Sequence, residues 1–142
     1  MVATERFEQL IAFLSSHLPE PVEQQGDGTG GIVFTGGSPG EVIAYLTDSI
    51  VEIGEFGVRW ENPGTPVVKA RRVGVLHWRR LPETPLMNAI ASLIKGAREM
   101  RLGRYRTCRY CGTANPPEWL QSDGVCLTCA ERESGTVRQE RP

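Results

Sequence analysis

All four cysteines of this 142-residue chain lie near its C-terminal end, in two pairs with the same internal spacing. Two residues separate Cys108 from Cys111 and Cys126 from Cys129, and fourteen residues separate the pairs. A Cys-x-x-Cys turn lets two sulfurs converge on one ion, and zinc takes four thiolates at about 2.3 Å. The spacing therefore predicts one structural Zn²⁺ site. Because four cysteines complete the tetrahedral shell, the motif leaves no coordination position for a catalytic water.

Thiol–disulfide chemistry is the alternative use of the same residues. The second pair is its better candidate, because helix formers follow Cys129 and a helix N-terminus favours the thiolate. In a reducing cytosol, however, paired Cys-x-x-Cys motifs favour metal over disulfide. Gly112 follows the first pair and permits the positive φ of a knuckle turn. We expect a knuckle at the first pair and a short helix at the second.

A knuckle, a turn-rich hairpin and a helix carrying the last two ligands resemble the treble-clef group of zinc fingers. The turns are indicated by the Asn-Pro-Pro run at 115–117 and by Asp123-Gly124. The zinc-ribbon arrangement has a glycine after each of two knuckles, whereas residues 127–132 contain no glycine, which favours the treble clef. The resemblance covers residues 106–135 and implies a Cys₄ zinc site at Cys108, Cys111, Cys126 and Cys129.

A basic stretch at residues 95–109 leads into the first cysteine pair. Arginines interleaved with aromatic residues suit phosphate contacts and base stacking. In the alternative interpretation, these arginines cap a helix, pair with acids and offset the zinc thiolates. The pI of about 6.1 is also well below that of a dedicated nucleic-acid-binding domain. The candidate contact residues for nucleic acid or a partner are Arg98, Arg101, Arg104, Tyr105, Arg106, Arg109 and Trp119.

The net charge of −1 conceals a strong asymmetry along the chain. Residues 1–68 carry ten acids and two arginines, whereas residues 69–109 carry eleven basic residues and two glutamates. Four thiolates around one zinc would add negative charge next to this basic segment. Part of the basic charge can therefore serve to neutralise the metal centre and the acidic N-terminal region.

Periodicity predicts an α+β fold. An apolar stripe from Phe7 to Leu18 predicts a helix over about 5–18, and residues 20–40 are expected to form a loop around a short strand at 32–35. Thr84 as N-cap and Pro85 as first helical residue predict a long helix that ends at Gly103, with Met100 on its inner face. Residues rich in Val, Ile and aromatics predict antiparallel strands at about 41–47, 50–54, 56–61 and 67–78.

The expected organisation is an α+β domain over 1–104, a zinc finger over 105–135 and a flexible tail over 136–142. The domain would contain an antiparallel sheet of four or five strands flanked by an N-terminal helix and a long second helix. A glycine-rich run at 26–31 precedes the strand at 32–35 but lacks the Gly-Lys-Ser/Thr and the strand–loop–helix order of phosphate-binding motifs. It is therefore interpreted as a hairpin connection.

Three classes of function stay open at this point. The first is a non-enzymatic, zinc-binding adaptor that presents its finger to a protein partner. The second is a nucleic-acid-associated factor that uses the basic stretch beside the finger. The third is a small-molecule-binding or enzymatic α+β domain, for which the sequence offers no recognisable site. The acidic N-terminus and the lack of a long apolar run predict a cytoplasmic protein without a membrane partner.

Overall fold

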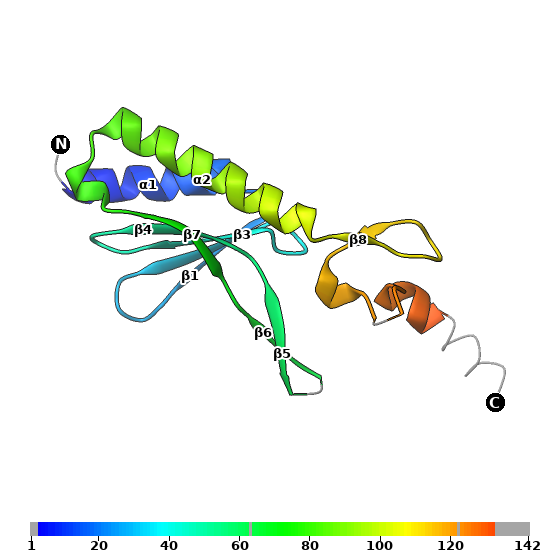
Figure 1. The fold of residues 1–142 in the computed structure, drawn as a ribbon. Helices are drawn as coiled ribbons and strands as arrows, with labels where there is room; N and C mark the ends of the chain where they lie inside the picture. The colour runs from blue at the N-terminus through cyan, green and yellow to red at the C-terminus, as the bar shows by residue number, and fades with distance from the viewer. Residues whose placement is uncertain (1–2, 63, 122, 133–142) are drawn as a thin grey trace. The chain divides into compact units, whose positions relative to one another are not determined.

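A computed structural model of the chain describes residues 3–62, 64–121 and 123–132 (Figure 1). The chain divides into two compact units, Met1–Arg101 and Leu102–Pro142, which we call the sheet unit and the cysteine unit. The sequence places the boundary between residues 104 and 105. The predicted tail, 136–142, lies outside the described residues. Among the described residues, no helix combines the length and the apolar character needed to cross a membrane.

The sheet unit contains a five-stranded antiparallel sheet in the order β1-β2-β3-β4-β7. The fold class predicted from the sequence is thus confirmed, but the loop predicted over 20–40 is wrong at its start. Val22 and the polar residues after it form an edge strand paired with β2. The glycine-rich run connects these two strands as a hairpin, as predicted. The strands are β1 (Val22–Gly26), β2 (Ile32–Gly36), β3 (Val42–Leu46), β4 (Val51–Glu55) and β7 (Arg71–Leu76).

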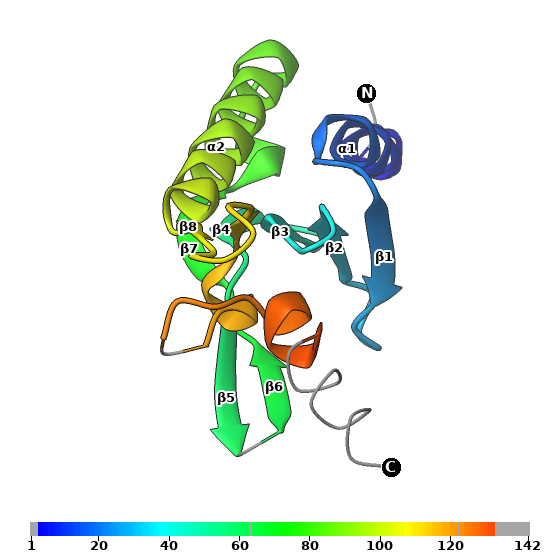
Figure 2. The ribbon, with the colours of Figure 1, turned by 90° about the vertical axis from the view of Figure 1, so that its right-hand side faces the viewer.

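Two helices, α1 (Ala3–His17) and α2 (Glu83–Gly103), cover one face of this sheet (Figures 1 and 2). The register aligns Phe34, Ala44, Ile53 and Gly74 in one row across four strands, and the first three are fully buried. Gly74 has a packing role, because a Cβ at this position would lie 2.7 Å from Cδ2 of Leu93 on α2. The core that results joins both helices to one sheet face: Leu10, Leu14, Leu18, Leu86, Ile90 and Ala97 pack against Phe34, Val42, Leu46, Val51 and Ile53.

The long second helix ends at Gly103, as predicted, but differs from its prediction at its start and on its inner face. It begins at Glu83, so Thr84 lies inside the helix instead of capping it. Near its C-terminal end, Met100 is 47% exposed, whereas Arg101 takes the inward position and is 1% exposed. Apolar periodicity places Met100 on the inner face because it counts apolar residues alone. It cannot predict that Arg101 is buried by contacts with residues far away in the chain.

Strands β5 (Val58–Asn62) and β6 (Thr65–Val68) follow β4 and precede β7 in the chain, and they form a separate two-stranded sheet. The single strand predicted over 67–78 is therefore wrong: it divides into β6 and β7, and a 3₁₀ turn, η1 (Trp78–Arg80), follows. Phe56, Val58 and Trp60 alternate with Gly57, Arg59 and Glu61, a pattern that predicts one buried face, but Trp60 is 50% exposed. Alternation detects a one-sided strand, but it cannot tell whether another element covers the apolar side.

The cysteine unit is built from short elements. These are β8 (Arg106–Thr107), β9 (Ala114–Asn115), the 3₁₀ turn η2 (Pro117–Trp119) and a helical segment over 127–132. Strands β8 and β9 pair in an antiparallel hairpin. The two cysteine pairs lie at the turn of this hairpin and at the start of the helical segment.

Candidate metal centre

The first cysteine pair occupies the turn between β8 and β9. The N–H of Cys108 donates to the carbonyl of Thr113 at 2.9 Å, and the N–H of Gly112 donates back to the carbonyl of Cys108 at 2.9 Å. Gly112 has a φ of 74°, a value that residues with a side chain rarely adopt. The knuckle predicted from the trailing glycine is therefore confirmed.

The second cysteine pair lies where a turn passes into a helix. Gly124 has a φ of 81°, and its N–H donates to the carbonyl of Gln121 at 2.9 Å, which confirms the turn predicted at Asp123-Gly124. Cys126 directly precedes the helical segment, and Cys129 lies in its first turn. The predicted difference between the two pairs is therefore also present in the structure.

The four sulfurs are spaced as a single tetrahedral metal requires. All of them lie within 4.8 Å of one another. The Sγ atoms of Cys108 and Cys129 are 3.8 Å apart, and those of Cys111 and Cys126 are 3.9 Å apart. Sulfurs at about 2.3 Å from a central ion in a tetrahedron are separated by about 3.8 Å, whereas a disulfide needs about 2.05 Å. The geometry fits a four-thiolate metal site and no disulfide.

Backbone N–H groups point at the sulfur of Cys108. The N–H groups of Tyr110 and Cys126 each lie 3.4 Å from its Sγ. Hydrogen bonds from the backbone, first from Cys111 and then from Cys126, lower the pKa of the Cys108 thiol to about 6. The pKa of Cys129 is raised instead, first by its hydrogen bond with Cys126. In the absence of a cation, four thiols at this spacing cannot all ionise, so ionisation of all four would need a positive charge at the centre of the cluster.

The cysteines are also most of the hydrophobic core of their unit. Among the described residues, its buried members are Cys108, Val125, Cys126 and Cys129, with Leu120 and Ala130 packed against them. Cys111 is the one exposed ligand of the four. A unit with so little apolar burial is poorly stabilised by the hydrophobic effect alone, and a metal ion held by the four thiolates would add free energy of folding.

Two of the candidate contact arginines are occupied inside the sheet unit. Arg98 Nε lies 2.6 Å from Oε1 of Glu41, in an ion pair with the start of β3. Arg101 Nε donates to the carbonyl of Gly40 at 2.9 Å, and its guanidinium lies 5.2 Å from the centre of the Phe56 ring. With 1% of its surface exposed, Arg101 is not available as a contact residue.

The remaining candidate residues lie in the cysteine unit. Arg104 and Tyr105 are half-buried, whereas Arg106 and Arg109 are exposed. Arg109 lies over the ring of Tyr110 at 5.3 Å from its centroid.

Beyond the end of α2, the described part of the cysteine unit exposes three large apolar side chains. Tyr110 is 57% exposed, Trp119 is 43% exposed and Leu127 is 40% exposed. Tyr110 lies between the cysteines of the first pair and Leu127 between those of the second. Of these three, the sequence indicated Trp119. Tyr110 is an aromatic residue beside the basic stretch, and the sequence gives no such signal for Leu127. Each of the two occupies a middle position of a Cys-x-x-Cys motif.

The cysteine group is the one cluster of metal-ligating side chains found within residues 3–62, 64–121 and 123–132. The two histidines do not join it. The His17 ring stacks on Phe13 with centroids 3.8 Å apart, and its Nδ1 lies 2.9 Å from the Phe13 carbonyl at the end of α1. Comparisons of the chain with protein-family models, with curated proteins and with solved structures found no match in any of the three.

Proposed function

We propose that this chain is a zinc-stabilised interaction protein, in which a structural ion holds the cysteine unit in shape for contact with a protein partner. The observation that carries the proposal is the four-sulfur cluster, with its separations of 3.8 and 3.9 Å. Four thiolates in a tetrahedron select zinc or iron among the common metals, and zinc is the usual ion where the site is closed and structural. A knuckle in the β8–β9 hairpin, a turn at Gly124 between the bridged residues Leu120 and Cys126, and a helical segment after Cys126 support a treble-clef arrangement for this unit.

A protein partner is favoured by the exposed apolar groups beside the metal ligands. Aromatic side chains are enriched at the energetic centres of protein interfaces, and tryptophan most of all. The unit leaves Tyr110, Trp119 and Leu127 exposed, although its core contains few apolar side chains. This arrangement suits a unit whose surface is completed by a partner with a complementary apolar patch. The expected cytoplasmic location, where thiols stay reduced, is consistent with this role.

Nucleic acid is the second candidate partner. It is supported by the exposed Arg106 and Arg109 and by the stacking of Arg109 on Tyr110. It is weakened by the engagement of Arg98 and Arg101 within the sheet unit, which removes two of the five arginines from the predicted set.

A pull-down from lysate with the zinc-loaded full chain, with and without nuclease, tests the proposal. We expect capture of a partner that survives nuclease, and Trp119→Ala should weaken it by at least tenfold. Trp60→Ala is the matched control, because Trp60 is equally exposed but lies in the sheet unit. If nuclease treatment abolishes capture and binding falls steeply with salt, the partner is a nucleic acid and the protein-partner proposal is wrong. Equal effects of the two tryptophan variants would contradict the assignment of the surface.

A further inference from the structure

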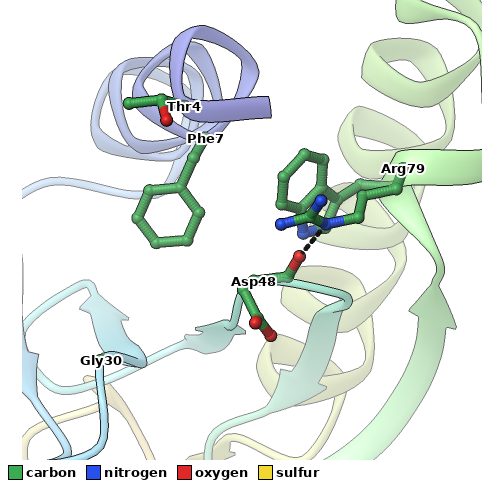
Figure 3. Close-up of a pocket in the computed structure, with 6 residues that line it drawn as sticks. Thr4, Phe7, Gly30, Asp48 and Arg79 are labelled. Atoms are coloured by element: carbon green, nitrogen blue, oxygen red, sulfur yellow. Dashed lines mark hydrogen bonds between the residues drawn. The ribbon is translucent and has the colours of Figure 1, made fainter. Parts of the chain in front are cut away.

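The sheet unit contains a pocket that is separate from the cysteine cluster. It has a volume of about 240 Å³ and is lined by Thr4, Phe7, Gly30, Asp48, Trp78 and Arg79. These residues come from α1, from the β1–β2 connection, from the β3–β4 turn and from η1. Figure 3 shows the Phe7 ring and the end of the Arg79 side chain on facing sides, with Asp48 below the guanidinium. Residues distant in the sequence thus meet at one end of the sheet.

The wall of the pocket formed by η1 is fixed in place. The indole Nε1–H of Trp78, a side chain that is 1% exposed, donates to the carbonyl of Thr47 at 2.9 Å. Arg79 Nε–H donates to the carbonyl of the next residue, Asp48. Both bonds attach η1 to the same β3–β4 turn. Thr47 in turn holds that turn, since its hydroxyl accepts N–H groups of Ser49 and Ile50.

Arg79 is held in a defined position while its terminal amino groups stay available. Its guanidinium lies 5.1 Å from the centre of the Trp78 ring, a cation–π contact, and Nε is engaged by Asp48. Within the described part of the chain, these are the contacts found for its side chain. The two terminal amino groups form a planar pair of donors that matches the two oxygens of a carboxylate. A positioned arginine also saves the ordering entropy that a mobile side chain would lose on binding.

We infer that this pocket binds a small carboxylic acid that carries an apolar or aromatic group. The carboxylate would pair with the terminal amino groups of Arg79, and the apolar group would lie against Phe7. The volume is below the roughly 300–1,000 Å³ of pockets for drug-sized ligands, so the ligand is a small metabolite. A single negative charge is favoured over a phosphate dianion, because Asp48 also lines the pocket and its carboxylate opposes a second negative charge there.

The test is a titration of the zinc-loaded full chain with 3-phenylpropionate, followed by the amide and tryptophan indole signals in NMR. We expect saturable shifts at Phe7, Gly30 and the Trp78 indole, and at least tenfold weaker binding of the neutral analogue 3-phenylpropanol. Arg79→Met should weaken binding of 3-phenylpropionate at least tenfold. Asp48→Asn should strengthen it by about twofold to fivefold, because a nearby negative charge is removed.

Arg80→Met is the matched control, because Arg80 is an exposed neighbour in the same 3₁₀ turn that does not line the pocket. The affinity of the Arg80→Met variant for 3-phenylpropionate should stay within twofold of that of the unchanged chain. The Trp78 indole signal reports in each variant whether the wall is intact. The inference is overturned if no saturable shift occurs up to the solubility limit of the acid. It is also overturned if the acid and the alcohol bind alike, or if Arg79→Met and Arg80→Met have equal effects.

Discussion

Arg101, in the last turns of α2, donates a hydrogen bond from Nε to the backbone carbonyl of Gly40, 61 residues earlier in the chain, at 2.9 Å. The same guanidinium lies over the ring of Phe56, just beyond the end of β4. One buried arginine therefore joins the end of the helix to two separate connections of the sheet. Burial strengthens these contacts, because water competes less for a buried guanidinium than for an exposed one.

We predict that Arg101→Met lowers the free energy of unfolding of the sheet unit by roughly 2–3 kcal/mol. The reason is that the partly buried carbonyl of Gly40 loses a hydrogen bond to a charged donor, and that the cation–π contact is lost with it. Urea denaturation followed by the Trp78 indole signal in NMR measures this. Arg98→Met is the control, because the more exposed Arg98–Glu41 pair should contribute about 0.2–1 kcal/mol. If both variants lost the same free energy of unfolding, the burial of Arg101 would add nothing to the stability of the sheet unit.

The contrast between these arginines explains which parts of the structure the sequence could predict. The cysteine cluster depends on short-range features, a Cys-x-x-Cys spacing and glycines at 112 and 124, so the sequence predicted it closely. The positions of Arg98 and Arg101 depend on Glu41 and Gly40, far away in the chain, and a count of basic residues cannot reveal such partners.

Strand β1 was missed for a different reason. It is an edge strand whose residues after Val22 are exposed and polar, so no alternation marks it. Only the pairing of Val22 with Gly36, and of the following residues with β2, makes it a strand. The pocket beside Arg79 was missed because its lining comes from four segments that only the fold brings together.

Metal removal should unfold one unit and spare the other. We predict that the purified chain carries one zinc per molecule, measured by native mass spectrometry and elemental analysis. EDTA should collapse the amide signals of residues 102–132, because cysteines make up most of the core there. The Trp78 indole signal should persist, since the sheet unit has an apolar core of its own. EDTA preloaded with zinc is the control. A cysteine unit that keeps its dispersed signals in free EDTA would refute the structural role of the metal.

The four ligands should differ in their importance for metal affinity. Cys108 is buried and its sulfur accepts backbone N–H groups of Tyr110 and Cys126, whereas Cys111 is exposed. At position 111 a water molecule can complete the coordination shell after substitution, as in zinc sites with three protein ligands. We therefore predict that Cys108→Ser weakens zinc binding at least tenfold more than Cys111→Ser does.

The zinc affinities of the two variants are measured by competition against a chromophoric chelator of known affinity. The substitution is the same Cys→Ser change at both positions. Retention of the amide signals of the sheet unit in both variants would show that each loss is confined to the cysteine unit. If Cys111→Ser proved as damaging as Cys108→Ser, the hydrogen bonds to Cys108 would have no part in holding the ion.

The loop between β1 and β2 should give the sheet unit a distinct acid sensitivity. Asp27 Oδ2 accepts the hydroxyl of Tyr45 at 2.5 Å, and Oδ1 accepts the N–H groups of Thr29 at 2.8 Å and Gly31 at 3.0 Å. The bond from Tyr45, followed by those from Thr29, holds the pKa of the Asp27 carboxyl well below its ordinary value of 3.8. The folded chain therefore binds this proton more weakly than the unfolded chain does.

It follows that the contribution of Asp27 to stability is fully present above about pH 4 and is lost progressively as the pH falls below that value. We predict that the difference in unfolding free energy between the unchanged chain and Asp27→Asn is constant from about pH 7 to 5 and shrinks below about pH 4. Urea denaturation at a series of pH values, followed by the Trp78 indole signal, measures it. Tyr45→Phe removes the strongest of these hydrogen bonds, so it should reduce the acid-dependent part while leaving the loop closed by Thr29 and Gly31. If the unfolding free energies of the unchanged chain and of Asp27→Asn differed by the same amount at every pH down to 2, the lowered pKa of Asp27 would be wrong. Protonation of a carboxyl whose pKa is the same in the folded and unfolded chain does not change the free energy of unfolding.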